Sequence, residues 1–530
     1  MGVIVVMLVV VLVVVGVLSI DSTDTGVLPP VDLMHRVVLD PMDKYVLQWT
    51  PREKDVIFEV QVATKGYVGL GFSPNGGMKG ADIILGWVDD TGNIFLHDRH
   101  STAYGVPNID ESQDVELLGG FQNDTHTVLR FSRPWVTCDP HGDLQLSEET
   151  VRLIWSYSSH DPMNEMTMTK HDDRGTWSTL LQAPVLVYPD LDQDVKTWDL
   201  LNPNVTLPSD QSTLYWCKMF KIPATAGKSQ VIGFVPVIEE RNVQNVHHVL
   251  LYECHVPGSD QLSSSHYYEK WLEVQGVQCY GPSMPVSWTY CSTPVFAWAV
   301  GSQGEMYPET TGLPLGEEYS GATYFLMETH YDNPSLQPGI VDSSGLRIFY
   351  TENLRQYDAG VIMLGQAISP LTIIPPHREW LSVGICQSDC TRQGLPEGGV
   401  EVFLGVLHSH LLGSYMRLRQ VRGDQELPSI LKDMNYDFNL QQSRSLKNFT
   451  ILPGDALILE CGYDSTKRDF PTFGGFSTNE EMCLAFLTYY PRVDLFLCSS
   501  SPDLKEILEG VGVEDVYDTD GLVFNRRGQL

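Results

Sequence analysis

Two histidines at the end of a strand-like stretch are the clearest candidates for chemistry. His408 and His410 close the segment Val400–His410, whose alternate residues are apolar. If the segment is a strand, both imidazoles project from one face and suit a single metal ion. The alternative is a pair of solvated or hydrogen-bonded polar side chains at a strand end. The spacing alone leaves both interpretations open.

Other side chains suited to metal chemistry lie far away in the sequence. His247 and His248 are adjacent, so they can share one metal only at a bulge or a strand terminus. His330 ends a strand-like run in which Glu328 shares its face, and Glu328 could accept a hydrogen bond from a ligand imidazole. Met482 alone indicates core packing, but beside two imidazoles its thioether is a soft ligand that selects Cu(I) over zinc.

Strands must position these residues, because strand-like alternation dominates the chain. In residues 56–62 the even-numbered positions are apolar, while Glu59 and Gln61 face the other way. Turn-forming stretches such as 74–77 and 140–143 separate these runs at short spacing. The pattern predicts an all-β protein.

Composition shifts divide the sequence into six segments. We predict a signal peptide or signal anchor at 1–20, a first β domain at 31–160, a linker at 161–213, two further β domains at 214–355 and 356–505, and a tail at 506–530. The linker is inferred from a Pro- and Asp-rich stretch. One short helix is expected at Asp503–Gly510, and the acidic tail after Cys498 is expected to pack poorly.

The N-terminus and the cysteines indicate the compartment. The apolar stretch Val3–Leu18 is shorter than a membrane span of about 20 residues, so a cleaved signal peptide and a retained membrane anchor are both open. Either directs the protein to the secretory pathway, as a membrane-associated protein of the endoplasmic reticulum or a secreted one. There the 10 cysteines predict disulfides. Sequons at Asn123, Asn204 and Asn448 predict glycosylation.

The charge excludes one class of partner. With 34 Lys and Arg against 67 Asp and Glu, the formal net charge is −33, which repels DNA and RNA. The same charge is compatible with small cationic ligands. Neither an H-E-x-x-H helix nor a G-x-S-x-G elbow occurs, which argues against the common hydrolases.

Taken together, the motifs resemble those of the copper type II, ascorbate-dependent monooxygenases, and most closely the DBH-like branch of that family. The motifs are His247-His248, His330-Tyr-Asp-Asn-Pro, His408-Ser-His410 and Glu480-Glu-Met482-Cys. The stretch Gly66-Tyr-Val-Gly-Leu-Gly-Phe-Ser-Pro resembles a DOMON domain. The resemblance implies a DOMON β-sandwich followed by two jelly-roll-like β-sandwich catalytic domains.

The resemblance also implies the cofactors and the reaction. An electron-transfer copper would be bound by His247, His248 and His330. A catalytic copper, where dioxygen is activated, would be bound by His408, His410 and Met482. Ascorbate would reduce both coppers, and a hydroxyl would enter an aliphatic C–H of a small, amine-bearing aromatic substrate. The electron would cross a solvent-filled cleft between the two catalytic domains.

The resemblance carries over to the cysteines. It implies the pairs Cys217–Cys279, Cys254–Cys291, Cys386–Cys498 and Cys461–Cys483. Cys138 and Cys390 remain, and they can pair with each other, pair between protomers of a homo-oligomer, or stay free. One departure concerns the pocket: relatives commonly carry Tyr where this protein has Phe486, so their substrate specificity cannot be copied.

Two other functions are compatible with the same residues. The first is a non-catalytic copper- or ligand-binding secretory protein on the same fold, which Phe486 and the short tail would suit. The second is haem-mediated electron transfer through the first β domain, with Met78, His97 and His100 as candidate ligands.

Overall fold

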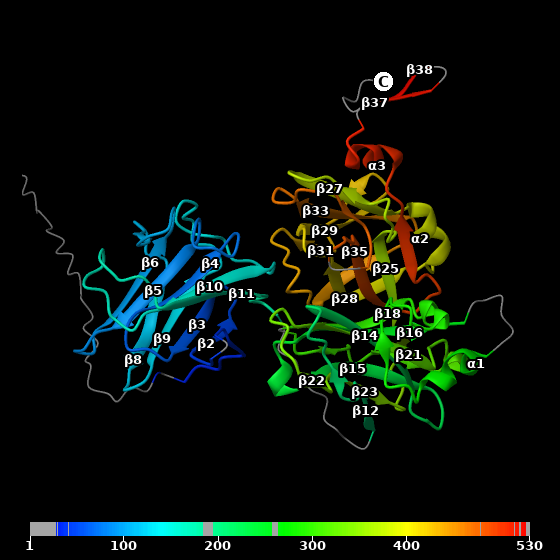
Figure 1. Ribbon diagram of the computed structural model, residues 1–530, viewed down its shortest axis with the longest axis horizontal. Helices are drawn as coiled ribbons and strands as arrows, with labels where there is room; N and C mark the ends of the chain where they lie inside the picture. Colours follow the sequence, from blue (N-terminus) through cyan, green and yellow to red (C-terminus); the bar gives the residue numbers. More distant parts are fainter. Residues whose placement is uncertain are drawn as a thin grey trace, which may run out of the picture.

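The computed structural model shows three β-rich domains in the order of the sequence (Figure 1). It describes residues 28, 30–40, 42–183, 194–256, 263–300, 302–476 and 479–513, and the backbone of 515–518 and 521–525. The predicted signal peptide or anchor at 1–20 lies outside this part of the protein. Among the described residues, no helix is long and apolar enough to cross a membrane. The prediction of an all-β protein is confirmed.

The first domain packs a five-stranded sheet against a six-stranded one. The first sheet has the order β1-β2-β3-β9-β8, with β1 (His35–Val38), β2 (Tyr45–Pro51), β3 (Asp55–Val62), β9 (Thr127–Pro134) and β8 (Glu116–Gln122). The second has the order β11-β10-β4-β5-β6-β7, with β11 (Asp173–Thr179), β10 (Val151–Tyr157), β4 (Val68–Ser73), β5 (Asp82–Val88), β6 (Ile94–His100) and β7 (Asn108–Ile109). Apolar side chains from both sheets form one core, and the even-numbered positions of 56–62 are all buried in it.

The second domain is another two-sheet sandwich. One sheet has the order β12-β23-β15-β20-β24, with β12 (Val195–Leu201), β23 (Gly345–Thr351), β15 (Ser229–Val237), β20 (Thr311–Leu315) and β24 (Tyr357–Asp358), and β19 (Glu305–Met306) also pairs with β15. The other has the order β17-β14-β21-β16-β18, with β17 (Val277–Gln278), β14 (Thr213–Lys221), β21 (Tyr324–Asp332), β16 (Val246–Cys254) and β18 (Thr293–Ala299). The helix α1 (Ser264–Tyr268) lies beside this second sheet (Figure 1).

The third domain repeats the arrangement. One sheet has the order β32-β28-β35-β25-β36, with β32 (Arg444–Ile451), β28 (Val400–His408), β35 (Leu484–Tyr490), β25 (Gly360–Gln366) and β36 (Leu497–Ser500). The other has the order β27-β33-β29-β30, with β27 (Glu379–Cys386), β33 (Asp455–Asp464), β29 (Gly413–Arg422) and β30 (Gln425–Glu426), and β31 (Leu431–Asp433) pairs with β29. Two other α-helices among the described residues are α2 (Ser388–Gly394) and α3 (Leu504–Gly510).

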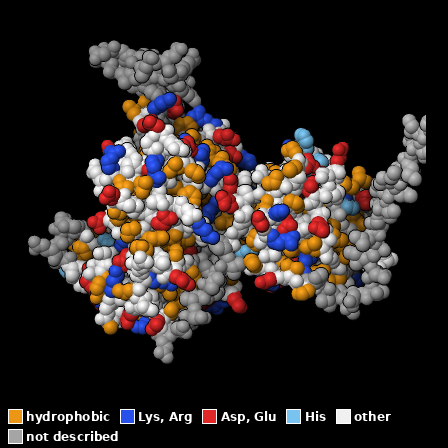
Figure 2. All heavy atoms as spheres, turned by 180° about the vertical axis from the view of Figure 1, so that it is seen from behind, with side chains coloured by type: hydrophobic (Ala, Val, Ile, Leu, Met, Phe, Trp, Pro, Cys, Tyr) orange, Lys and Arg blue, Asp and Glu red, His pale blue; other side chains and the backbone are white. Residues whose placement is uncertain are grey.

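The second and third domains share their packing. Val361 and Phe403 of the third domain belong to the same buried cluster as the core of the second. Across this boundary Arg492 donates to the buried carboxylate of Glu253 at 2.9 Å. Burial alone would raise the pKa of Glu253, but Arg492 and His255 together outweigh burial and hold that pKa below its usual value. The two domains therefore form one unit, which appears as a single lobe beside the first domain in Figure 2.

Two sequence expectations require correction. Residues 161–213 are not simply a linker: β11 completes the first sandwich, while β12 pairs with β23 in the second. The tail does not begin poorly packed, since α3 is capped by Asp503 and Glu506 accepts hydrogen bonds from Ser382 and Gln366. In both stretches polar composition concealed elements whose partners are distant in sequence.

Candidate metal centre

The first imidazole set lies on two neighbouring strands of one sheet. His248 of β16 pairs directly with His330 of β21, and the register shifts between Val246 and His248. This β-bulge removes the strict alternation of side chains, so His247 and His248 turn toward the same place. The three ring centroids lie 4.8–5.3 Å apart. The sequence left a bulge or a strand end open as ways to join the pair, and the structure forms the bulge.

The chemistry of this set fits a metal ion. The Nδ1 atoms of His247 and His248 lie 3.1 Å apart. The Nδ1 of His330 is buried without a hydrogen-bond partner among the described residues, while its Nε2 lies 2.6 Å from the Thr213 hydroxyl. Burial, followed by repulsion from neighbouring imidazoles, lowers the pKa of His247 and of His248. Neutral imidazole is the form that binds metals, and all-imidazole sets suit copper.

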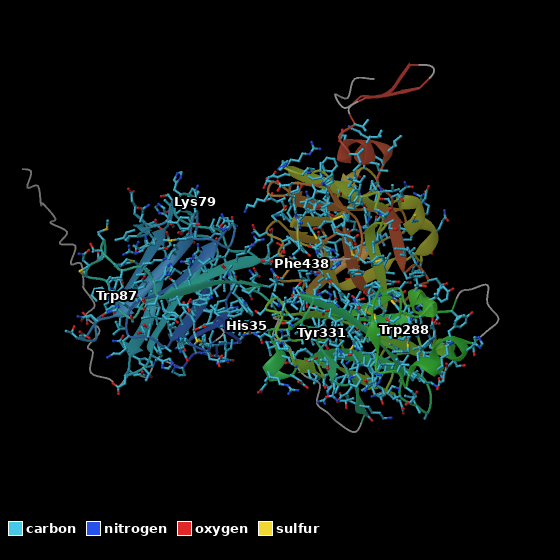
Figure 3. The ribbon with its side chains drawn as sticks, in the orientation of Figure 1. His35, Lys79, Trp87, Trp288, Tyr331 and Phe438 are labelled. Atoms are coloured by element: carbon cyan, nitrogen blue, oxygen red, sulfur yellow. A yellow bond between two sulfur atoms is a disulfide. The ribbon has the colours of Figure 1, made fainter. Side chains whose placement is uncertain are left out.

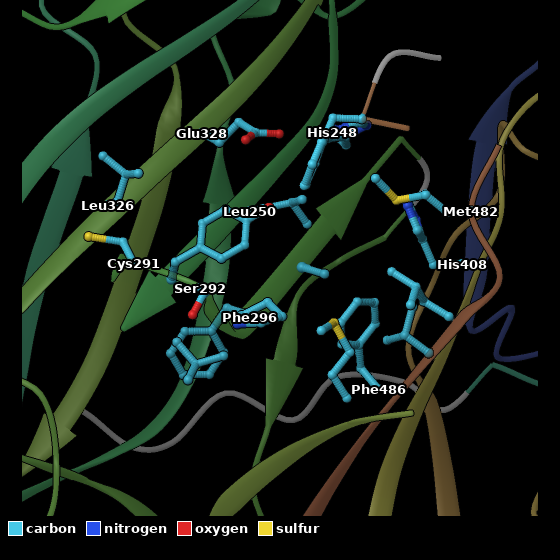
Figure 4. Close-up of a pocket in the computed structure, with 18 of the residues that line it drawn as sticks. His248, Leu250, Cys291, Ser292, Phe296, Leu326, Glu328, His408, Met482 and Phe486 are labelled. Atoms are coloured by element: carbon cyan, nitrogen blue, oxygen red, sulfur yellow. The ribbon is translucent and has the colours of Figure 1, made fainter. Parts of the chain in front are cut away.

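The second set is assembled where β28 ends and β35 begins. His408 is the last residue of β28 and pairs with Leu484, so Met482, two residues before Leu484, lies beside it. His410 follows in the next turn, with its ring centroid 5.1 Å from that of His408. Figure 4 shows His408 and Met482 side by side at the cavity. Two imidazoles and a thioether form a donor set that favours Cu(I).

Hydrogen bonds fix the tautomers of the second set. The Nδ1–H of His408 donates to Gln441 Oε1 at 2.5 Å, and that of His410 donates to the Glu480 carbonyl at 2.9 Å. This tautomer places the lone pair on Nε2, the atom that can then bind a metal. Burial and the neighbouring His410 lower the pKa of His408 to about 3, so its ring is neutral.

A buried glutamate, which the sequence analysis quoted in a motif but gave no role, shapes the turn that carries His410. Glu481 accepts hydrogen bonds from the Ser409 hydroxyl and from the backbone N–H of His410 and of Leu412, at 3.0, 2.9 and 2.6 Å. Burial raises its pKa to about 7. Because Glu481 precedes Met482, one residue connects the turn of the imidazoles to the Met482 thioether.

An aromatic ring lies between the two sets, and the sequence gave no signal for it. Phe438 stacks on His247 with ring centroids 5.0 Å apart and meets His410 edge-on at 6.1 Å. Figure 3 shows Phe438 near the junction of the three domains. The expected solvent-filled cleft is therefore bridged here, because one phenyl ring touches an imidazole of each set.

A cavity of about 610 Å³ opens beside the two sets (Figure 4). His248 lines it from the second domain, and His408, His410 and Met482 line it from the third. Its remaining walls are mostly aromatic and aliphatic, with two buried carboxylates, Glu305 and Glu328. Among the described residues that line it, none is Lys or Arg. The cavity therefore suits a small, partly aromatic molecule that carries positive charge.

Two predicted pocket residues lie in this cavity. Phe486 forms part of the wall, with its ring centroid 6.2 Å from that of His408. Glu328 accepts a hydrogen bond from the Tyr280 hydroxyl at 2.5 Å, rather than from a ligand imidazole as the sequence suggested. Burial raises the pKa of Glu328 to about 7. Glu328 therefore belongs to the cavity wall.

The four disulfides join the pairs that the resemblance implies. They are Cys217–Cys279, Cys254–Cys291, Cys386–Cys498 and Cys461–Cys483. In the last pair, Cys483 directly follows Met482 in the sequence. Cys138 and Cys390 are exposed and unbonded. The sequon residues Asn123, Asn204 and Asn448 are exposed, as glycosylation would require.

The candidate haem ligands of the first domain do not line one common cavity. Met78 lines a cavity of that domain, but neither His97 nor His100 does. His100 contacts the Asp110 carboxylate, and the ring of His97 packs edge-on against Trp87. Neither histidine therefore lies in the cavity that Met78 lines.

Fold and site together define a protein in which paired β-sandwiches bring an all-imidazole set and a His/Met set to one cavity. Comparison with known proteins agrees. Residues 198–338 and 357–509 match the N-terminal and C-terminal domains of the family described as copper type II ascorbate-dependent monooxygenase, and residues 41–158 match the DOMON domain.

Individual relatives match over most of the sequence. DBH-like monooxygenase protein 1 of Mus musculus is 43% identical over 497 residues, covering 91% of this chain and 77% of its own length. MOXD1 homolog 1 of Drosophila melanogaster is 40% identical, covering 91% and 70%. Dopamine beta-hydroxylase of Canis lupus familiaris is 32% identical, covering 90% and 75%. The chain belongs to the copper type II ascorbate-dependent monooxygenases.

Proposed function

We propose that this protein is an active monooxygenase that hydroxylates an aliphatic C–H of a small aromatic amine, with copper at both ligand sets. One oxygen atom of O2 enters the substrate and the other leaves as water, while ascorbate supplies the two electrons that balance the reaction. Bound copper would store the electron at the all-imidazole set and activate dioxygen at the His/Met set. The observation that carries the proposal is the aromatic, acidic cavity against which both sets lie.

Glu305 is the group that would hold the amine. It lies on β19, is 7% exposed, and receives a hydrogen bond from the Ser443 hydroxyl. Burial raises its pKa to about 7, so an ammonium group would convert a costly buried charge into an ion pair. Glu328 is less suited, because the Tyr280 hydroxyl already donates to it.

The aromatic walls would orient the rest of the substrate. Phe296, Trp298 and Phe486 line the same cavity as Glu305 and the second set. An aryl ring packed among them would be excluded from water, and an aliphatic C–H next to that ring could approach Met482 and His408. Phe486 has no hydroxyl, so this wall recognises shape and not a hydrogen-bonding group.

The compartment is part of the same proposal. Four disulfides and three exposed sequons support a protein of the secretory pathway lumen, either membrane-associated in the endoplasmic reticulum or secreted.

Oxygen consumption by copper-loaded protein with ascorbate would test the activity. The probes are 2-phenylethylamine, 2-phenylethanol and phenylacetate, which share a ring and differ in charge. We expect oxygen uptake and a product with one added oxygen atom for the amine, and little for the alcohol or the acid. If 2-phenylethanol were turned over as fast as 2-phenylethylamine, the proposed preference for an amine would be wrong. The proposed monooxygenase activity would still stand.

The non-catalytic alternative gives a different result. A copper-binding protein would hold metal at both sets, measured by mass spectrometry of desalted protein, yet would consume no oxygen beyond the ascorbate blank with any probe. That outcome would reject the proposed activity while leaving the ligand assignments intact.

A further inference from the structure

The loop of residues 433–441, called the bridging loop below, connects the first domain to both ligand sets. It begins at the last residue of β31 in the third domain and carries Phe438 and Gln441. One of its sides faces strands β10 and β11 of the first domain, and the other faces the imidazoles. The bridging loop thus lies between the DOMON sandwich and the metal centre, near the junction where Phe438 is marked in Figure 3.

Side chains of the first domain bind the middle of the bridging loop from its outer side. The Arg152 guanidinium donates to the Tyr436 carbonyl at 2.5 Å and lies 3.6 Å from the Asp437 carboxylate. The Ser178 hydroxyl donates to the same carboxylate at 2.5 Å. The other oxygen of Asp437 accepts from the Asn439 backbone at 2.9 Å. A single carboxylate therefore joins the shape of the loop to the first domain.

A second contact fixes the start of the loop. The Thr150 hydroxyl donates to the fully buried carboxylate of Asp433 at 2.5 Å. Arg444 of the third domain pairs with the same carboxylate. Hydrogen bonds to buried charged groups are among the stronger ones, and losing one leaves a desolvated charge. These contacts anchor the loop more firmly than exposed ion pairs would.

The inner side of the loop touches three of the ligand imidazoles. Phe438 stacks on His247 and meets His410 edge-on. Gln441 accepts the hydrogen bond that fixes the tautomer of His408, and its own amide donates to the Phe438 carbonyl at 2.9 Å. These contacts reach one ligand in the first set and two in the second.

The loop also holds the turn between the two imidazoles of the second set. The Tyr436 hydroxyl donates to the Ser409 carbonyl at 2.7 Å and accepts from the Ser409 backbone N–H at 2.9 Å. Tyr436 is almost completely buried, and its own carbonyl is the acceptor for Arg152. The same residue therefore contacts the first domain through its backbone and the ligand turn through its phenol.

We infer that the DOMON domain is a positioning module for the metal centre: it holds the bridging loop so that Phe438, Gln441 and Tyr436 set the placement of the two ligand sets. None of these residues needs to touch substrate. The first domain would act through the bridging loop on the imidazoles, so its loss would loosen the ligand turn even without metal. The inference goes beyond the proposed substrate and does not depend on it.

Hydrogen–deuterium exchange of the full-length, metal-free protein tests the inference directly. In the double variant Arg152→Ala/Ser178→Ala, we expect exchange to become about tenfold faster both in 434–441 and in the ligand turn 405–412. Faster exchange in the loop alone, or in neither segment, would overturn it. If the double variant does not fold, Ser178→Ala removes one contact and should give the same pattern at about threefold.

Two further variants separate positioning from general destabilisation. Tyr436→Phe keeps the ring and the carbonyl that Arg152 contacts but loses both hydrogen bonds to Ser409, so exchange should rise in 405–412 while the strands of the first domain remain unchanged. Arg52→Ala removes an exposed ion pair of the first domain with Asp55 and should leave both segments unchanged. If Arg52→Ala accelerated exchange in both segments equally, any damage to the first domain would be enough to loosen them. That result would contradict specific positioning of the loop by Arg152 and Ser178.

A kinetic measurement adds a second readout, which rests on the proposed function. In copper-loaded Arg152→Ala/Ser178→Ala, kcat for 2-phenylethylamine should fall about tenfold with little change in KM, because the cavity that binds the amine is intact. A rise in KM with constant kcat would place the effect on substrate binding and contradict positioning of the ligand sets. Without turnover in the wild type the proposed function fails, while the exchange experiment still decides the inference.

Discussion

The two ligand sets are held in place by different kinds of structure. In the first set, three imidazoles come from two paired strands of one sheet, and a single β-bulge aligns them. In the second, the ligands come from a strand end, a turn and the approach to another strand. Glu481 and Gln441 accept hydrogen bonds from that region, and Tyr436 donates one to it, and these bonds support the arrangement.

This difference indicates where each set is sensitive. Backbone pairing inside a sandwich is cooperative and local, so the first set should tolerate loss of a single supporting side chain. The second set depends on buried polar groups, which are costly when a partner is missing, and on a loop that another domain grips. The set assigned to oxygen chemistry is therefore the one with the more distributed support.

The largest expected effect comes from removing the thioether. Met482→Ile exchanges one buried apolar side chain for another of similar volume, so the fold should be retained. Hydroxylation should fall by about a hundredfold or more, because the second set loses a metal ligand. Oxygen uptake with 2-phenylethylamine measures the loss, and copper per protomer shows whether one of the two sets has lost its metal. Turnover like that of the wild type would reject Met482 as a ligand.

A ligand of the first set should give a smaller and different defect. His247→Ala removes the imidazole that stacks on Phe438, and we expect copper per protomer to fall from two to about one with turnover reduced about tenfold or more. The second set should still bind carbon monoxide when reduced, which infrared spectroscopy would detect. Unchanged steady-state activity would remove His247 from the mechanism.

Glu305→Gln tests whether the substrate amine is bound by a residue that belongs to neither ligand set. With a folded pKa of about 7 against an ordinary value near 4.5, Glu305 gains its charge as pH rises through about 7. The KM for the amine should therefore fall as pH rises through that range in the wild type. In the glutamine variant, KM should be about tenfold higher and flat with pH, with kcat nearly unchanged. A pH profile retained in the variant would show that another group binds the amine.

The raised pKa of Glu305 also affects the stability of the fold. Rising pH should strengthen amine binding but weaken the contribution of Glu305 to stability. Because the pKa of Glu305 is higher in the folded protein, its contribution is most favourable below about pH 4.5 and declines as pH rises to about 7. Glu305→Gln should thus gain stability relative to the wild type on going from pH 5 to pH 8. Thermal unfolding at the two pH values measures this difference.

Residue types and motifs sufficed to name the candidate ligands that the fold brings together, but contacts between distant segments did not follow from them. The His-x-His spacing on a strand and the ordered motifs pointed to both sets, and the matching families confirm the resemblance. The bulge at His247 was one of two open options, since bulges depend on the partner strand. Phe438 gave no signal, because its role arises only where three domains meet.

Glu481 and β11 show two further reasons why parts of the site and the fold could not be predicted from the sequence. Glu481 lay in a quoted motif, yet only the folded turn reveals that its carboxylate gathers three hydrogen bonds. β11 falls inside the predicted linker 161–213, which rests on a Pro- and Asp-rich stretch; its place as an edge strand is set by pairing with β10. Burial and pairing decide such cases, and neither can be read from local composition.

The smallest expected effect probes the support of the first set. Thr213→Val keeps the shape of the side chain but removes the hydroxyl that lies 2.6 Å from His330 Nε2. Asp332 lies 3.3 Å from the same nitrogen and can take over part of this role. We expect copper affinity of the first set to fall only about threefold to tenfold, with the second set unaffected, as measured by competition with a chelator.

Thr91→Val, which removes an exposed hydroxyl bonded to Asp89 in the first domain, is the matched control and should leave both affinities unchanged. A loss at the first set as large as that expected for His247→Ala would contradict the view that backbone pairing holds this set. It would mean that the first set, like the second, depends on individual side-chain hydrogen bonds, and the contrast between the two sets would disappear.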